Sequence, residues 1–215
     1  MPVLRKDGAA LLFVHIPKTG GGSVETAFRK QGWKVDHFDG TSGPDSMNYL
    51  RLNSPQHADA AQIEATFRLE RFAAVFAFVR DPLARIKSEY VWRHRSDEGV
   101  DTSGRAFEKW LKSNLRQTLT NPWRYDNHFR PQVDFMVRGA RTLRMEDGID
   151  AGLSHLADLT GLDVPRSAPR RHAGSNVSTV SPSDIEVTVK AAKRVSDFYT
   201  EDYRRFGYER PDADR

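Results

Sequence analysis

The 215-residue sequence contains no cysteine. This absence excludes disulfide-bonded scaffolds, thiolate nucleophiles and metal sites built on sulfur, and it is typical of a reducing compartment. We therefore expect a cytoplasmic protein. Long apolar stretches are also absent, because the longest ones, residues 9–16 and 72–79, are far shorter than the ~20 residues that a membrane-spanning helix needs. We expect no membrane span.

The chain has no large excess of charge of either sign, since 33 Lys and Arg stand against 29 Asp and Glu, which gives a net charge of +4. The basic residues are dispersed, which argues against a nucleic-acid partner but is compatible with an anionic ligand. The 15 glycines and 11 prolines are too few for a collagen-like or low-complexity chain. The length favours a single domain over residues 1–215, with a frayed tail at 210–215.

Hydrophobic patterning predicts strands that alternate with helices. We expect strands at 9–16, 33–38, 72–79 and 141–145, and helices from 23, at 58–71, from 82, at 105–115 and at 150–160. Residues 182–206 are expected to form a long helix or a helix pair. The unbroken apolar run at 72–79 is typical of a strand buried on both faces of a parallel sheet. The alternation predicts an α/β protein, a P-loop-like three-layer fold with a central, mainly parallel sheet flanked by helices.

A glycine loop joins the first predicted strand to the helix that follows, and Ser23 is the expected N-cap of that helix. The loop consists of Lys18, Thr19, Gly20, Gly21, Gly22 and Ser23. Consecutive glycines let backbone N–H groups point at one anion, and the helix N-terminus adds partial positive charge. The loop therefore predicts a phosphate or sulfate site. In nucleotide triphosphatases the lysine follows the glycines, whereas Lys18 precedes them, so an ATP-dependent kinase is the alternative.

A second strand-to-helix junction contains Arg80, with Asp81 as N-cap and Pro82 at the first helical position. Ser88 lies about two helical turns after the cap, on the side of the helix start. A guanidinium and a hydroxyl suit a phosphate monoester. The alternative is that Arg80 pairs with a carboxylate and Ser88 is merely exposed. Ligands of parallel sheets bind at the carboxyl ends of strands, so we expect both junctions to face one crevice.

These two junctions carry a resemblance to a known family. FVHIPKTGGGS (residues 13–23) resembles the 5′-phosphosulfate loop of the sulfotransferases that use 3′-phosphoadenosine 5′-phosphosulfate (PAPS), and FVRDPLARIKSEY (residues 78–90) resembles their 3′-phosphate motif. NHFRPQ (127–132), NVS (176–178) and DYRRFGY (202–208) are similar to segments of the carbohydrate branch, which includes the heparan 2-O-sulfotransferases. The resemblance implies an enzyme with PAPS as donor, adenosine 3′,5′-bisphosphate as product, a glycan or glycoconjugate hydroxyl as acceptor, and no metal.

The resemblance also implies roles for individual residues. Lys18 contacts the bridging oxygen and assists the leaving phosphate, residues 19–23 hold the phosphosulfate, and Arg80 and Ser88 bind the 3′-phosphate. The acceptor hydroxyl needs a general base, for which neutral histidine is suited, and His57 lies where the 2-O-sulfotransferase branch carries a catalytic histidine. Glu25 is the alternative base, although an acidic residue in the first turn also stabilises a helix N-terminus. The sequence does not decide between these two.

Other interpretations stay open at this point. Besides the kinase, the chain could be a module that binds a phosphorylated nucleotide or another polyanion without turnover. His15 is expected to be a strand residue behind the loop. The basic segment 166–183, with Arg170, Arg171 and His172, either closes over the cofactor or is solvated.

Overall fold

The computed structural model describes residues 1–95, 99–169 and 180–211. Arg170, Arg171 and His172, the NVS segment at 176–178 and the end of the expected frayed tail lie outside the described residues. The chain forms two compact units that alternate along the sequence. The first unit comprises the described residues of 1–79, 125–127 and 134–171, and the second unit comprises the rest. The expectation of a single domain stays a prediction.

The first unit contains a five-stranded sheet of order β3-β1-β2-β4-β5. β2, β4 and β5 are parallel neighbours, whereas β1 is antiparallel to both β2 and β3. The expectation of a mainly parallel central sheet is confirmed, and the carboxyl ends of β2 and β4 lie at the same edge. The strands are β1 (Val3–Lys6), β2 (Ala9–Val14), β3 (Lys34–Asp36), β4 (Ala74–Val79) and β5 (Arg141–Arg144).

Strand β1 was not predicted from the sequence, although a signal was present. Asp7 and Gly8 join β1 to β2, and both have left-handed backbone conformations, with φ of 48° and 82°. An Asp-Gly pair between two short apolar segments is a strong hairpin signal because both central residues of a type I′ turn need positive φ. Residues 3–14 therefore form a hairpin rather than one isolated strand.

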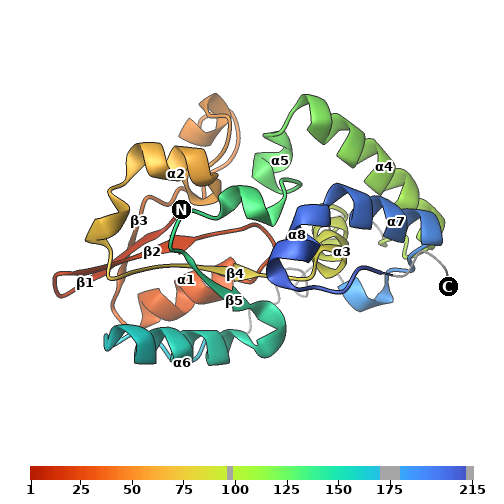
Figure 1. Ribbon diagram of the computed structural model, residues 1–215. Coiled ribbons are helices and arrows are strands. Elements are labelled where there is room, and N and C mark those ends of the chain that lie inside the picture. Colours follow the sequence, from red (N-terminus) through yellow and green to blue (C-terminus); the bar gives the residue numbers. More distant parts are fainter. Residues whose placement is uncertain (96–98, 170–179, 212–215) are drawn as a thin grey trace. The chain divides into compact units, whose positions relative to one another are not determined.

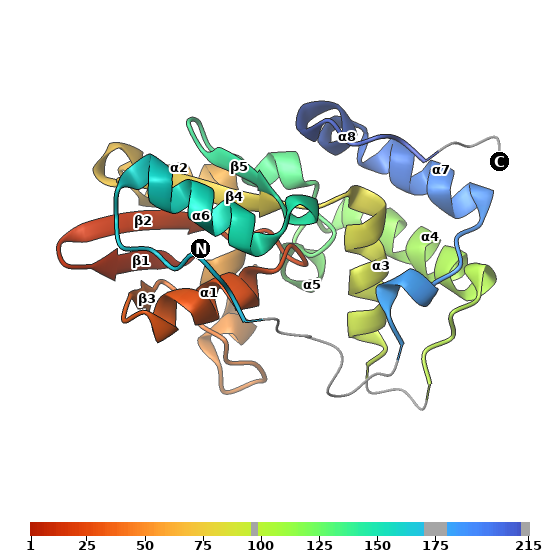
Figure 2. The same cartoon turned by 90° about the horizontal axis from the view of Figure 1, so that it is seen from below.

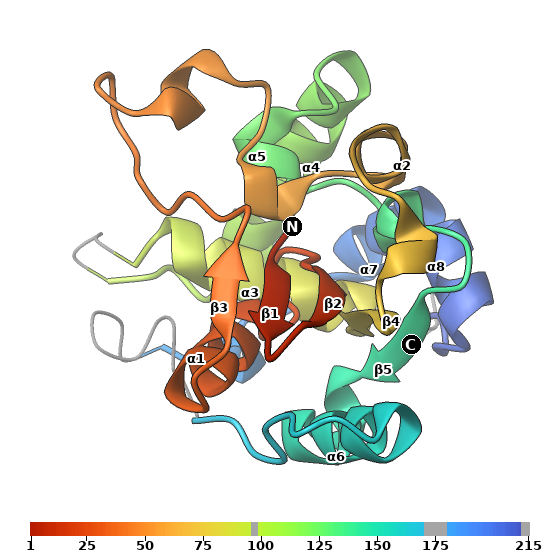
Figure 3. The ribbon, with the colours of Figure 1, turned by 90° about the vertical axis from the view of Figure 1, so that its left-hand side faces the viewer.

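Helices cover both faces of this sheet (Figure 1). α1 (Gly21–Lys30) and α6 (Ile149–Thr160) lie side by side on one face, in front of the strands in Figure 2. α2 (Ala60–Thr66) and the long connection before it lie on the other face (Figure 3). The three-layer arrangement is therefore confirmed. The shared core includes Leu11, Phe13, Phe76 and Phe78 of the strands, Val24, Ala27 and Phe28 of α1, and Leu153 and Leu156 of α6.

These core positions follow from the two structural periods. Phe76 and Phe78 are two residues apart on β4 and point to the same face, and Val24 and Phe28 are four apart on α1. Burying one phenylalanine fully stabilises the fold by roughly 1.5–3 kcal/mol. Gly152 is also determined by this packing, since a Cβ there would come within 2.7 Å of the Phe78 ring.

Several predicted boundaries were wrong by a few residues. The helix expected over 58–71 is shorter and consists of α2 alone. It ends before Phe67, which has an extended backbone, and residues 69–71 form only a 3-10 turn. In the part of the chain that the structure describes, the 3-10 turns are η1 (Met47–Leu50), η2 (Pro55–His57), η3 (Leu69–Arg71), η4 (Gln132–Phe135), η5 (Met145–Asp147) and η6 (Pro182–Asp184). Gly161 ends α6 in a left-handed conformation, as the sequence predicted.

The second unit is helical, with α3 (Pro82–Arg93), α4 (Gly104–Thr120), α7 (Val189–Phe198) and α8 (Thr200–Phe206). α7 packs against α3 and α4. Of the helix or helix pair predicted over 182–206, the structure contains the pair, α7 and α8, and α4 is longer than the predicted 105–115. Within the described residues, no helix combines the length and the apolar character needed to cross a bilayer.

Candidate active site

The glycine loop connects β2 to α1 in the first unit, as predicted. Lys18 and Gly20 have left-handed φ values of 69° and 85°, which turn the chain from the strand into the helix. Thr19 is fully buried, and its hydroxyl donates a hydrogen bond to the Ile16 carbonyl at 2.8 Å. The Thr19 side chain therefore holds the loop, and its hydroxyl serves the fold in this structure.

The N-cap of α1 is Gly20, so the expectation of Ser23 as cap was wrong. Gly20 reaches the left-handed cap conformation without steric strain, and the helix begins two residues earlier than expected. Ser23 is buried inside the first turn, where its N–H donates to the Gly20 carbonyl at 2.9 Å. For the same reason Glu25 lies beyond the first turn, and α1 has no acidic residue there.

The three glycines of the loop differ in the space that a side chain would have at each position. A Cβ at Gly20 would lie 2.7 Å from Ile149 Cδ1, and a Cβ at Gly21 would lie 2.0 Å from His15 Nε2. At Gly22, apart from its chain neighbours and the adjoining backbone of α1, no heavy atom of the described residues lies within 4 Å of the Cβ position, and φ is not in the left-handed region. Protein packing and backbone conformation therefore do not require Gly22. Close approach of an anion to the backbone would require it.

The second junction lies in the second unit. Asp81 accepts from the Ala84 N–H at 2.8 Å and precedes Pro82, which confirms the predicted cap. The buried Gln132 side chain accepts from the Arg80 N–H at 2.9 Å and donates to the Arg80 carbonyl at 2.8 Å. Asp202 in turn accepts from the Gln132 N–H at 2.9 Å. This network fixes the backbone of Arg80.

Arg80 and Ser88 are both half-buried and belong to the second unit. Their convergence on one phosphate stays a prediction, as does a crevice shared with the glycine loop. The structure adds the two hydrogen bonds that hold the Arg80 backbone. The sequence around Arg80 does not reveal them, because their partner, Gln132, lies 52 residues away.

His57 lies at the end of η2 in the first unit, with 11% of its side chain exposed. Its Nδ1 lies 2.7 Å from Oδ2 of Asp126. Ser54 donates to the same carboxylate twice, from its N–H at 2.5 Å and from its hydroxyl at 2.6 Å. A carboxylate on Nδ1 holds a proton there, so the nitrogen that can accept a proton is Nε2.

The ionised state of Asp126 is strongly favoured. Burial acts to raise its pKa, but the hydrogen bond and charge of His57 and the hydrogen bonds of Ser54 outweigh it and hold the pKa well below its usual range. The carboxylate is therefore charged at neutral pH, and it stabilises an imidazolium at His57 when that ring gains a proton.

Sequence reasoning missed Asp126, which lies 69 residues from His57. It stands in a short turn labelled α5 (Arg124–Asn127), where Tyr125, Asp126 and Asn127 have left-handed φ values of 48°, 60° and 64°. Each such residue stores about 1 kcal/mol or more of strain, which surrounding contacts must offset. One of these contacts is the hydrogen bond from Asn127 Nδ2 to the His57 carbonyl at 2.8 Å. Asn and Asp tolerate this region best, which was the available signal.

Glu25 is turned into the interior of the first unit, with 4% of its side chain exposed. Its Oε1 lies 2.7 Å from His15 Nδ1, and its Oε2 lies 3.8 Å from Arg29. Burial acts to raise the pKa of Glu25, but the neighbouring His15, Arg29 and His57 lower it below its usual range. His15 follows the end of β2 and is therefore a loop residue rather than a strand residue.

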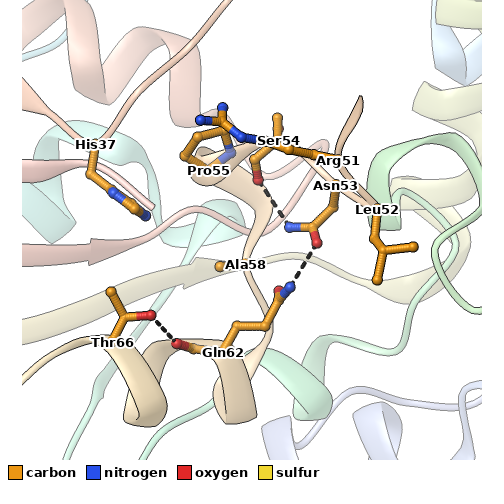
Figure 4. Close-up of a pocket in the computed structure, with 9 residues that line it drawn as sticks. All are labelled: His37, Arg51, Leu52, Asn53, Ser54, Pro55, Ala58, Gln62 and Thr66. Atoms are coloured by element: carbon orange, nitrogen blue, oxygen red, sulfur yellow. Dashed lines mark hydrogen bonds between the residues drawn. The ribbon is translucent and has the colours of Figure 1, made fainter. Parts of the chain in front are cut away.

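A cavity of about 280 Å³ adjoins the His57 region within the first unit (Figure 4). Ser54 belongs to both, because it lines the cavity and also holds Asp126. The Asn53 amide donates to the Ser54 carbonyl, and the Gln62 amide donates to Asn53. The lining residues are His37, Arg51, Leu52, Asn53, Ser54, Pro55, Ala58, Gln62 and Thr66.

A comparison with protein-family models matches residues 2–209 to the model described as "Sulfotransferase family". The match spans nearly the whole chain and includes both junctions, His57 and Asp126. Comparisons with curated proteins and with solved structures give no match.

Proposed function

The chain belongs to the sulfotransferase family, and from this premise we propose that it transfers a sulfuryl group from PAPS to a hydroxyl of a carbohydrate-like acceptor. One observation carries the proposal: a glycine loop open at Gly22 and a histidine oriented by a half-buried carboxylate lie in the same compact unit. An anion cradle and a proton acceptor are the two parts that sulfuryl transfer requires.

The proposed donor contacts involve both junctions. Backbone N–H groups of residues 19–22 and the side chain of Ser23, whose own N–H donates to the Gly20 carbonyl, would hold the 5′-phosphosulfate. Lys18 would neutralise charge that develops on the bridging oxygen as the bond to sulfur breaks. Arg80 and Ser88 would bind the 3′-phosphate, the group that distinguishes PAPS from ATP. The hydrogen bonds between Gln132 and the Arg80 backbone support this role, because paired guanidinium–phosphate hydrogen bonds need a defined geometry and a fixed backbone provides the starting point for it. The residues in these roles need no metal.

His57 is the proposed general base. As the acceptor oxygen attacks sulfur, Nε2 of His57 takes the hydroxyl proton, and the sulfur–oxygen bond to the donor phosphate breaks to release adenosine 3′,5′-bisphosphate. Asp126 stabilises the imidazolium that forms. The contacts of Glu25 with His15 and Arg29 argue for His57 over Glu25 in this role.

The cavity beside Ser54 is the proposed acceptor site. Its polar side chains, among them Asn53 and Gln62, suit an acceptor rich in hydroxyl groups, and its volume is close to the lower end of the usual range for ligand sites. Membership of the carbohydrate, heparan 2-O-like branch is proposed on the sequence resemblance. Location in the cytoplasm stays a prediction from the absence of cysteine.

Calorimetric titration with adenosine 3′,5′-bisphosphate, without metal, tests the donor site. We expect binding that Arg80→Ala weakens at least tenfold, whereas Arg204→Ala, which removes an exposed arginine paired with Glu201, leaves it unchanged. A preference for ATP with magnesium would support the kinase alternative instead. Bisphosphate binding without any release of bisphosphate from PAPS would support a binding module.

A further inference from the structure

His15 stands between the two halves of the proposed chemistry. On one side its ring packs against the glycine loop so closely that a Cβ on Gly21 would lie 2.0 Å from Nε2. On another side its ring meets the His57 ring edge-on, with centroids 4.9 Å apart and an interplanar angle of 82°. All of these residues belong to the first unit.

Two further contacts hold the His15 ring in place. It stacks on Phe13, with centroids 5.4 Å apart, and Phe13 is itself fully buried in the core. Its Nδ1 lies 2.7 Å from Glu25 Oε1, the distance of an ion pair. With 12% of the His15 side chain exposed, the ring is enclosed by the loop, the core, the carboxylate and His57.

We infer that His15 is a positioning residue that fixes the separation between the glycine loop and His57, and that Glu25 anchors it. The inference rests on the proposed function for its catalytic meaning. His57 is then held by Asp126 at Nδ1 and by the His15 ring beside it. Glu25, the alternative base from sequence, acts on the acceptor only through His15 and His57.

The inference also accounts for the second glycine of the loop. Gly20 makes the turn, Gly22 leaves open space, and Gly21 admits the His15 ring against the backbone. A fixed separation matters because in-line transfer requires the attacking oxygen, the sulfur and the base in one geometry. A misplacement of about 1 Å can reduce the rate roughly a hundredfold.

A double-variant experiment tests the link to the loop. In Gly21→Ala the new Cβ displaces the His15 ring, so we expect bisphosphate affinity and the rate of bisphosphate release from PAPS with water as acceptor to fall together. His15→Ala in the same chain makes room for that Cβ. We expect the double variant to regain bisphosphate affinity to within about threefold of the wild type, while its rate stays about a hundredfold lower. Recovery of the rate together with affinity would overturn the inference.

Nuclear magnetic resonance of the imidazole nitrogens tests the link to His57 without any turnover. Glu25→Gln keeps the shape of the anchor and removes its charge, so we expect the His57 resonances and titration to change. Arg29→Met is the matched control, because it removes the outer partner of Glu25 and leaves the His15 contact in place. Arg29 is 42% exposed and lies 3.8 Å from Glu25, so solvent screens its charge, and we expect a smaller change at His57 in this variant than in Glu25→Gln. Unchanged His57 spectra in Glu25→Gln would refute the anchoring role.

The two measurements separate the inference from the proposed function. A wild-type protein that binds no bisphosphate would defeat the proposed function, while the imidazole spectra would still decide whether Glu25 and His15 set the state of His57. Bisphosphate binding with His15→Ala at the wild-type rate would leave the function intact and refute the positioning role.

Discussion

Asp126→Asn is the substitution that most directly tests the proposed base. The carboxylate accepts three hydrogen bonds, two from Ser54 at 2.5 and 2.6 Å and one from His57 Nδ1 at 2.7 Å. An amide replaces one acceptor oxygen by an NH₂ donor. If the NH₂ faces Ser54 N–H, two donors oppose each other; if it faces His57, it donates to Nδ1 and favours the proton on Nε2. The second arrangement removes the proposed base.

The magnitude follows from the charged hydrogen bond alone. Such a bond is worth about 1.5–3 kcal/mol, and loss of 3 kcal/mol from the transition state reduces the rate roughly 150-fold. Asn adopts the left-handed conformation of position 126 as readily as Asp, so backbone strain does not confound the comparison. We therefore expect a rate about 10- to 150-fold lower, with bisphosphate affinity within twofold of the wild type.

The assay is the initial rate of adenosine 3′,5′-bisphosphate release from PAPS, with calorimetry on the same preparations. Asp158→Asn is the control, because Asp158 is an exposed residue in a surface ion pair with Arg166. A rate in Asp126→Asn within threefold of the wild type would falsify the role of Asp126.

The same substitution has a pH signature in stability. The folded protein holds the pKa of Asp126 below its usual value of about 3.9, so the carboxylate stabilises the fold above that pH. This contribution is lost as the pH falls toward the lower folded pKa. Urea unfolding should therefore show the full difference between wild type and Asp126→Asn at pH 7 and a smaller one below pH 4. A difference that grew on acidification would contradict this account.

Two further predictions concern the donor contacts. Gly22→Ala should leave the melting temperature unchanged or slightly raised and weaken bisphosphate binding at least tenfold, because the new Cβ meets ligand rather than protein. Gly20→Ala should lower the melting temperature instead, because Gly20 has a φ of 85° and its Cβ would lie 2.7 Å from Ile149. Equal effects of both substitutions on melting would refute this distinction. Gln132→Leu removes the two hydrogen bonds between the Gln132 side chain and the Arg80 backbone, so urea unfolding should show a free energy of unfolding lower by about 2–4 kcal/mol. Calorimetry should show a weaker affinity for bisphosphate, and an unchanged affinity would show that Gln132 does not support the donor site.

Local features of the fold were predictable because they depend on neighbours in sequence. The glycine loop after an apolar strand, the Asp81 cap with Pro82, and the Gly161 end of α6 are each decided by the backbone preferences of a few adjacent residues. The β1 hairpin depends on adjacent residues in the same way, because Asp7 and Gly8 provide the two left-handed positions of its turn. The predicted N-cap of α1 was wrong because two residues that can cap a helix, Gly20 and Ser23, lie within one turn of each other.

The sequence by itself determined the family, the order of the two junctions and the residue types that could bind phosphate, because these are patterns along the chain. Tertiary structure alone decided that Asp126 orients His57, that His15 separates Gly21 from His57, and that Gln132 holds Arg80. The reason is physical: a hydrogen bond or a packed ring depends on distances of a few ångströms, and residues 69 or 52 positions apart acquire those distances only when the chain is folded.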